Sequence, residues 1–243
     1  QVLYDVSFHV KPGEIYGLVG ESGSGKTTVL KCLAGLFTHW QGELTIDAQP
    51  LGHEISRERC RQVQMVFQDP YGSLHPRHTI GDILEEPLQI HRINDRDRRI
   101  NVLLDKVGLN RAFRERYPHQ LSGGQQQLVL IARALVSASQ NILLDEPCSA
   151  LDLGNQQVVL QLIGDLAHRQ ARTVLFTTHD PNHALQVASH TLLLLPEGRW
   201  LAGETADVLS ETHLRQAYGL PVRLIRHAAS AFPLLAPGFT LRR

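Results

Sequence analysis

The stretch Gly20–Thr28, GESGSGKTT, matches the pattern G-x-x-x-x-G-K-[ST]. Glycines in this pattern let a loop curl so that backbone N–H groups face bound phosphates. The amine of Lys26 can reach the β- and γ-phosphates of a nucleotide, and the hydroxyl of Thr27 can hold Mg²⁺. An apolar run, Ile15–Val19, precedes the loop and a helical pattern, Thr27–Leu36, follows it, as a phosphate-binding loop requires. We expect the phosphates to be held by Gly20, Ser22, Gly23, Ser24, Gly25, Lys26, Thr27 and Thr28.

Outward from this loop, strand patterns alternate with helical patterns. Further strands are predicted at Val2–Val10, Gly42–Asp47, Gln62–Phe67, Asn141–Leu144 and Thr173–Thr177, and a hairpin at His190–Glu204. Helices are predicted at about Gly124–Val136, Asn155–Arg169 and Thr205–Tyr218. This alternation implies a parallel sheet with helices on its faces. The end of the chain, from about Ala228, is rich in Pro, Gly and Ala and is expected to be loosely ordered.

The segment Thr79–Arg116 differs from the rest of the chain. It carries apolar residues at helical spacing and no strand signal, so we interpret it as an inserted helical subdomain.

Composition limits the classes of function. The 24 acidic and 24 basic residues balance, which gives no electrostatic reason to expect nucleic acid as a partner. Three cysteines without metal-ligand spacing indicate a reducing compartment and no disulfide framework. No apolar run approaches the ~20 residues needed to span a bilayer, and no signal peptide is visible. The chain starts at Gln1 without Met, so we expect the natural N-terminus to lie further upstream.

Polar residues follow three of the predicted strands. Asp145 and Glu146 end the strand of NILLDEP, where Asp145 can hold Mg²⁺, directly or through water, and Glu146 can act as general base for an attacking water. His179 follows TVLFTT and can contact a γ-phosphate, because ligands of open α/β sheets bind at the carboxyl ends of strands. With 13 histidines in the chain, an ordinary exposed histidine is the alternative. Gln68, after VQMVF, is either a loop residue or a sensor of Mg²⁺ and water.

Taken together, these motifs resemble the ATP-binding subunit of ABC transporters. The motifs are GESGSGKTT (Walker A), Gln68 (Q-loop), LSGGQ at Leu121–Gln125 (signature), ILLDEP (Walker B), SALD at Ser149–Asp152 (D-loop) and His179 (switch histidine). Their order and spacing match the family over essentially the whole chain. The resemblance implies an ATPase with ATP and Mg²⁺ as cofactors, with Glu146, His179 and Gln68 as catalytic residues and Thr27, Gln68 and Asp145 at the metal.

The resemblance also implies a fold and its division. The fold class is α/β: a P-loop NTPase with a mainly parallel core sheet, an N-terminal antiparallel β subdomain and an inserted α-helical subdomain. We assign residues 1–78 to the N-terminal β subdomain and the P-loop part of the core, and 79–123 to the helical signature subdomain. Residues 124–220 form the remainder of the core, and 221–243 form a C-terminal extension.

In this family two nucleotide-binding domains pack head to tail, and the signature of one covers the ATP held by the other. Here a helix N-terminus at Ser122–Gly124 provides an anion site of the right kind. The resemblance therefore implies a homodimer, or a heterodimer with a second ABC ATPase. The residues that would act across the interface are Leu121, Ser122, Gly123, Gly124 and Gln125 of the signature, and Ser149, Ala150, Leu151 and Asp152 of the D-loop.

The family context implies a subunit that powers an importer from the cytoplasmic face of the inner (plasma) membrane, as a peripheral protein. Its partners would be transmembrane permease subunits that dock near Gln68–Leu88, with Tyr71, Leu74 and Pro76 as apolar anchors. An extracytoplasmic substrate-binding protein would act indirectly, and nucleic acid would not be a partner. The alternative is a soluble ABC-type ATPase that is not coupled to transport. A small-molecule phosphotransferase would not need LSGGQ or SALD, and a degenerate domain would not keep its catalytic residues.

The two halves of the chain resemble different importer ATPases. Val66–Leu88 and Arg116–Gln125 look like oligopeptide, dipeptide and nickel importers, whereas the sequence from about Gln126 looks like metal-chelate importers for siderophores, haem, cobalamin or molybdate. The chain is either a recombinant of the two types or one sample of a broad family. Gln-Gln-Leu stands at 126–128 where the peptide group has Arg-Gln-Arg, and Cys148 stands where Thr is usual. Tyr4 lies too near the first strand to be the family's adenine-stacking aromatic, which we expect upstream of Gln1. The sequence does not identify the cargo.

Overall fold

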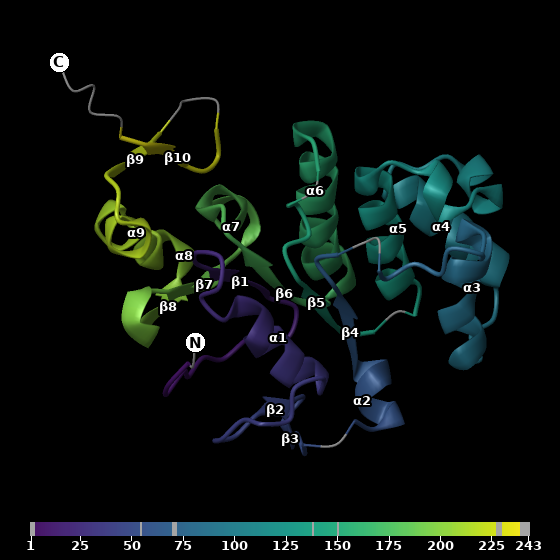
Figure 1. The fold of residues 1–243 in the computed structure, drawn as a ribbon, viewed down its shortest axis with the longest axis horizontal. Helices are drawn as coiled ribbons and strands as arrows, with labels where there is room; N and C mark the ends of the chain where they lie inside the picture. The colour runs from purple at the N-terminus through teal and green to yellow at the C-terminus, as the bar shows by residue number, and fades with distance from the viewer. Residues whose placement is uncertain are drawn as a thin grey trace.

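A six-stranded sheet forms the centre of the molecule (Figure 1). The computed structural model describes residues 3–53, 55–69, 72–137, 139–149, 151–226 and 230–238. Along the sheet the strands are β4 (Val63–Val66), β5 (Asn141–Leu144), β6 (Thr173–Thr178), β1 (Ile15–Val19), β7 (His190–Leu194) and β8 (Trp200–Glu204). All neighbouring pairs are parallel except β7 and β8, which are antiparallel. The predicted mainly parallel sheet is confirmed.

The central strands are short, mainly apolar runs because both faces of the sheet are covered there. All five residues of β1 are buried. Successive side chains alternate between two hydrophobic clusters: Ile142 and Leu144 of β5 lie in the larger cluster, and Leu143 between them lies in the smaller one.

Different helices cover the two faces. On the smaller cluster lies α1 (Lys26–Ala34), which begins at the P-loop and ends at Gly35, whose φ of 81° is a left-handed cap that favours glycine. The larger cluster is built with α5 (Gly123–Val136) and α6 (Leu153–Gln170). The short helix α7 (Pro181–Val187) packs against α6 and β1.

The predicted helical insert is confirmed. It contains α3 (Ile80–Ile90), α4 (Arg96–Lys106) and two short 3₁₀ helices, η1 (Arg111–Glu115) and η2 (Pro118–Gln120). A reciprocal capping box between Thr79 and Asp82 fixes the start of α3. Figure 1 shows these helices grouped beside α5, against which α3 and α4 pack. The boundaries assigned to the subdomains from sequence stay a prediction.

The N-terminal strand prediction is wrong for the described residues 3–10, which form no strand. Leu3, Val6, Phe8 and Val10 are half-buried against the smaller cluster, so their alternation reflects burial on one side without a hydrogen-bonded neighbour strand. Among residues 3–53, antiparallel pairing is limited to β2 (Thr45–Ile46) with β3 (Gln49–Pro50). The helix α2 (Arg57–Gln62) then leads into β4.

The C-terminal part differs from the sequence prediction in two places. The hairpin of β7 and β8 turns through η3 (Pro196–Gly198) as expected. The single helix predicted after it is two helices, α8 (Thr205–Val208) and α9 (Glu211–Tyr218), because Ser210 caps a new helix start. Within the end expected to be loosely ordered, β10 (Leu234–Pro237) instead pairs with the preceding strand β9 (Val222–Ile225). Residues 227–229 and 239–243 lie outside the described residues. In the part of the chain that the structure describes, no helix is long and apolar enough to cross a membrane.

Candidate functional site

The sheet order brings the predicted site residues to one edge. The P-loop follows β1, Gln68 follows β4, Asp145 follows β5 and His179 follows β6. These four strands are neighbours and run parallel, so their carboxyl ends meet. Ligands of open α/β sheets bind at such an edge.

The P-loop holds its lysine firmly. The Lys26 amine donates to the backbone carbonyls of Gly20 and Glu21, both at 2.9 Å, and the side chain is only 4% exposed. Gly25 has a φ of 103°, and a Cβ there would lie 2.8 Å from the Leu3 side chain. The left-handed conformation therefore favours glycine at this position, and a side chain there would also displace Leu3. Burial lowers the pKa of Lys26, and the nearby carboxylate of Glu146 opposes the shift.

Asp145 joins the P-loop to the end of β6. Its Oδ1 accepts hydrogen bonds from the hydroxyls of Thr27, at 2.9 Å, and Thr177, at 2.8 Å. The residue is 2% exposed, and its backbone N–H donates to Val66 O across the sheet. The Thr27 hydroxyl and the Asp145 carboxylate are hard oxygen ligands of the kind that Mg²⁺ prefers. Sequence reasoning missed Thr177, although the paired threonines that end an otherwise apolar strand, TVLFTT, were the available signal.

Three predicted site residues contact the Glu146 carboxylate. Its carboxylate lies 3.5 Å from the Lys26 amine, 3.0 Å from His179 Nδ1 and 3.4 Å from Gln68 Nε2. Its side chain is 11% exposed. The backbone φ of 45° places Glu146 in the left-handed region, which non-glycine residues seldom adopt and which is often found at functional sites.

Tyr218 supports the histidine from a distant part of the chain. Its hydroxyl, at the end of α9, donates to the backbone carbonyl of His179 at 3.0 Å. Burial raises the pKa of Tyr218 above its usual value, with the carboxylates of Asp180, Glu21 and Glu146 adding to the shift, so the hydroxyl keeps its proton. Nothing in the local sequence indicated this contact.

The signature residues form the start of α5. The Ser122 hydroxyl accepts from Gln125 N–H at 3.2 Å, and the Gln125 side chain accepts from Ser122 N–H at 3.1 Å. The Gln126 amide, one of the departures from the peptide group, donates to Pro118 O and Leu121 O and so braces the turn before the helix. Within the described residues, no hydrogen bond or ion pair joins residues 121–125 to residues 20–28.

The D-loop lies directly after the acidic pair. The Ser149 hydroxyl donates to Glu146 O at 3.0 Å, and Leu151 is buried. Asp152 caps α6 through Asn155 N–H at 2.8 Å. Ala150 is outside the described residues.

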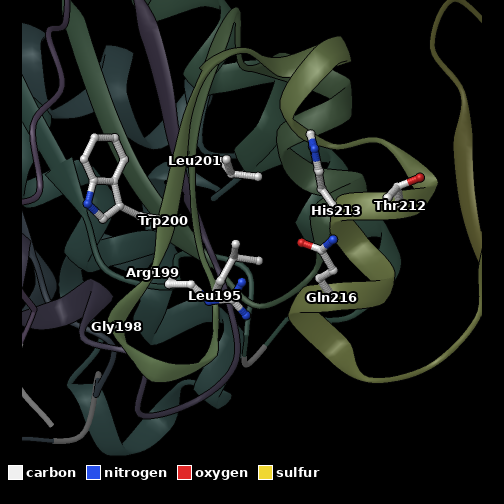
Figure 2. A pocket seen from close by; sticks show the side chains of 8 residues that line it. All are labelled: Leu195, Gly198, Arg199, Trp200, Leu201, Thr212, His213 and Gln216. Carbon is white, nitrogen blue, oxygen red and sulfur yellow. The ribbon is translucent and has the colours of Figure 1, made fainter.

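A separate hollow of about 440 Å³ lies between the β7–β8 hairpin and α9 (Figure 2). In this view Leu201 points toward α9, whereas the Trp200 ring lies on the other side of β8. The lining contains none of the predicted site residues. A cradle of backbone N–H groups at a sheet edge binds phosphates without a deep cavity, so this hollow does not compete with the P-loop as the nucleotide site.

Comparison with known proteins agrees with this geometry. Residues 3–149 match the sequence profile of the family described as ABC transporter. The chain belongs to this family, as an ATP-binding domain. It is 37% identical over 98% of its length to the oligopeptide transport ATP-binding protein OppF of Bacillus subtilis, of which it spans 78%. It is 43% identical over 72% of its length to OppF of Streptococcus mutans, of which it spans 59%.

Solved structures of this ABC family share the fold. One is an inward-facing conformation of a putative metal-chelate type ABC transporter, with a TM-score of 0.75 and 32% sequence identity. The alignment covers 96% of this chain and 90% of the transporter chain. Another is a dimeric ATP-binding cassette in a post-hydrolysis state bound to ADP and Pi, with a TM-score of 0.74 and 30% sequence identity. The alignment covers 84% of this chain and 90% of the cassette chain. The ABC ATPase assignment and its α/β fold are therefore confirmed. Because the peptide-type and the metal-chelate-type similarity each cover nearly the whole chain, the recombinant origin stays a prediction.

Proposed function

We propose that this ABC ATPase powers a peptide importer, with ATP hydrolysed at the carboxyl edge of the sheet. The observation that carries the proposal is the convergence of Lys26, Gln68 and His179 on the Glu146 carboxylate. The peptide assignment is supported by relatives named as oligopeptide transport ATP-binding proteins. The chain spans little more than half of several of these relatives, so the activity of the whole protein is part of the proposal.

The residues at this edge fit ATP and Mg²⁺. Gly20–Thr28 would hold the phosphates, with backbone N–H groups and the Lys26 amine as donors. Ser24 Oγ is buried and has no hydrogen-bond partner within the described residues, so it is a polar atom still to be satisfied by a ligand. Thr27 and Asp145 would hold Mg²⁺, with Gln68 beside them. When bound, the ion would neutralise developing charge on the phosphates.

Hydrolysis requires a proton acceptor for the attacking water. In the proposal Glu146 takes this proton on its carboxylate, since it is the acid placed beside the P-loop lysine and the switch histidine. His179 orients that carboxylate through Nδ1 and would contact the γ-phosphate. Gln68 would position the water, and it donates to Glu146 Oε2 at 3.4 Å.

The active unit in this proposal is a dimer. The signature caps α5 but has no described contact with its own P-loop, which supports a role on a partner's nucleotide. The backbone N–H groups at the start of this 14-residue helix, with its positive dipole end, suit a phosphate. Solved relatives include dimeric cassettes. The dimer would pair this chain with a second copy of itself or with a second ABC ATPase.

Permease subunits would dock beside Gln68–Leu88, with the chain at the cytoplasmic face of the membrane. Pro76 in this segment is exposed, and Phe67, which directly precedes the segment, is 38% exposed, so both can contact a partner. The prediction that Leu74 is an anchor is wrong, because Leu74 is 5% exposed and packs in the larger core cluster. Tyr71 lies outside the described residues.

Co-purification tests the importer proposal. The tagged chain should retain the permease subunits of a peptide importer from detergent-solubilised membranes, and reconstituted permease should raise its ATPase rate. Retention of a metal-chelate permease would replace the peptide assignment. An active ATPase that retains neither would favour a soluble ATPase that is not coupled to transport.

A further inference from the structure

Thr177 occupies an unusual position behind the two acidic residues of the site. It lies near the end of β6 and is completely buried, with 0% exposure. Its hydroxyl makes two hydrogen bonds: Oγ1 donates to Asp145 Oδ1 at 2.8 Å and accepts from the backbone N–H of Glu146 at 2.8 Å. One hydroxyl therefore connects the side chain of one acid to the backbone of the next.

The first bond fixes the Asp145 carboxylate. Asp145 Oδ1 accepts from Thr27 on the P-loop side and from Thr177 on the β6 side. Thr27 belongs to the proposed metal site, and its hydroxyl would be drawn to the ion. Thr177 is a neighbour buried inside the sheet, and its bond can persist when Thr27 turns to the metal. The carboxylate would then remain oriented with its second oxygen free for a ligand.

The second bond supports the backbone at Glu146. The φ of 45° is a conformation that a glutamate adopts only when its surroundings hold it there. The hydrogen bond from Glu146 N–H to Thr177 Oγ1 is such a restraint, because a buried N–H without a partner is costly. This backbone conformation sets the direction in which the Glu146 carboxylate leaves the strand, toward Lys26 and His179.

We propose that the Thr177 hydroxyl is a positioning group that aligns Asp145 for the divalent cation and Glu146 for the attacking water. It acts through the two acids, since it is buried beneath them. The inference rests on the proposed hydrolysis at this site and adds a residue outside the family motifs quoted above.

Two substitutions distinguish the effect of the Thr177 hydroxyl from the effect of side-chain packing. Thr177→Val keeps the branched shape and removes the hydroxyl, whereas Thr177→Ser keeps the hydroxyl and removes a methyl group. Thr191→Val is a matched control: Thr191 is also 0% exposed in the same sheet, and its hydroxyl bonds Thr205 Oγ1 at 2.9 Å, far along the chain from the acids. Any loss caused simply by deleting a buried hydroxyl should appear in both valine variants.

The decisive measurement is the affinity for a fluorescent ATP analogue, with Mg²⁺ and with EDTA. Wild-type protein should bind more tightly with Mg²⁺, and this gain should shrink by about 3–10-fold in Thr177→Val, the size expected for loss of one typical intramolecular hydrogen bond. The affinity in EDTA should not change, because the P-loop is intact. Thr177→Ser and Thr191→Val should keep the Mg²⁺ gain within about 2-fold. The gain is the ratio of two dissociation constants measured on the same variant, so a folded fraction that lowers both affinities equally cancels from it.

The turnover number provides the second readout. The kcat of Thr177→Val should be about 10–100-fold below that of the wild-type protein, whereas Thr177→Ser should keep most of the wild-type kcat. The inference is overturned if Thr177→Val keeps the wild-type Mg²⁺ gain. It is also overturned if the serine variant is as impaired as valine, because packing would then be the cause. Wild-type protein without Mg²⁺-dependent hydrolysis would instead reject the proposed function, so the two failures can be told apart.

Discussion

His179 Nδ1 lies 3.0 Å from Glu146 Oε2, which joins the ends of β6 and β5 across the candidate site. Glu146 is largely buried, whereas the His179 side chain is 56% exposed. A carboxylate held in this way points in one direction, and the histidine can still turn toward a nucleotide. In the proposed function, the pair would combine a fixed base with a mobile contact for the γ-phosphate.

The first prediction concerns the proposed base. Glu146→Gln keeps the size of the side chain and removes its ability to accept a proton. We expect ATP binding to persist and the hydrolysis rate to fall by roughly 10²–10⁴-fold, the usual contribution of acid–base catalysis. Phosphate release assays and equilibrium nucleotide binding measure the two quantities. The blocked variant should also accumulate as an ATP-bound dimer in size-exclusion chromatography.

Glu115→Gln is the matched control, because Glu115 is exposed in the helical insert and distant in sequence from the acidic pair. It should behave like the wild-type protein. Near-normal turnover of Glu146→Gln would show that another group accepts the proton.

A second prediction concerns the support of His179 by Tyr218. Tyr218→Phe removes only the hydroxyl that donates to His179 O. We expect kcat to fall by about 2–10-fold through looser placement of the histidine, with little change in nucleotide affinity. Because burial raises the pKa of Tyr218, its hydroxyl stays protonated at ordinary pH, and the wild-type to variant ratio should be constant from pH 6 to pH 9. A ratio that changes across this range would mean that Tyr218 titrates and acts differently.

Motifs with a strict spacing allowed much of the site to be predicted from sequence. The strand–loop–helix context located Lys26 and Thr27, and the parallel sheet then required Gln68, Asp145 and His179 to share an edge. Asp145 accepts a hydrogen bond from Thr27 of the P-loop. Gln68 and His179 both contact the Glu146 carboxylate, which lies 3.5 Å from the Lys26 amine. The P-loop and the strand ends are local patterns, and a parallel sheet fixes their relative positions.

Contacts that depend on side-chain direction were not predictable in this way. Thr177 and Thr178 are adjacent and chemically identical, but only the Thr177 hydroxyl faces the acids, while Thr178 bonds Asp180 and His183. Tyr218 reaches His179 from 39 residues further along the chain. The alternation at the N-terminus predicted a strand because burial on one side has the same period with or without a pairing strand.

A third prediction tests the placement of Cys148, which stands where Thr is usual. Cys148 is 3% exposed, and burial raises the pKa of its thiol to about 12. The thiol should therefore remain protonated and unreactive at pH 8. Iodoacetamide followed by peptide mass spectrometry should label the exposed Cys60 and spare Cys148 until the protein is denatured. Labelling of Cys148 in the folded protein at a rate similar to Cys60 would contradict its burial.

The last prediction tests whether the signature acts on the nucleotide of a partner. Ser122→Arg places a bulky cation at the exposed start of α5, and Lys26→Ala removes the P-loop amine. Each variant should be inactive alone, because every site of its dimer carries one defect. In a mixed dimer one site combines both defects, and the other combines an intact P-loop with an intact signature.

Equal mixing of the two variants should therefore restore activity. If chains pair at random and the two sites work independently, about a quarter of the wild-type sites are intact. The measurement is the ATPase rate of the mixture, with dimers of differently tagged chains isolated by two successive affinity steps. If signature and P-loop acted within one chain, the isolated mixed dimers would remain as inactive as their parents, because neither chain would have a complete site.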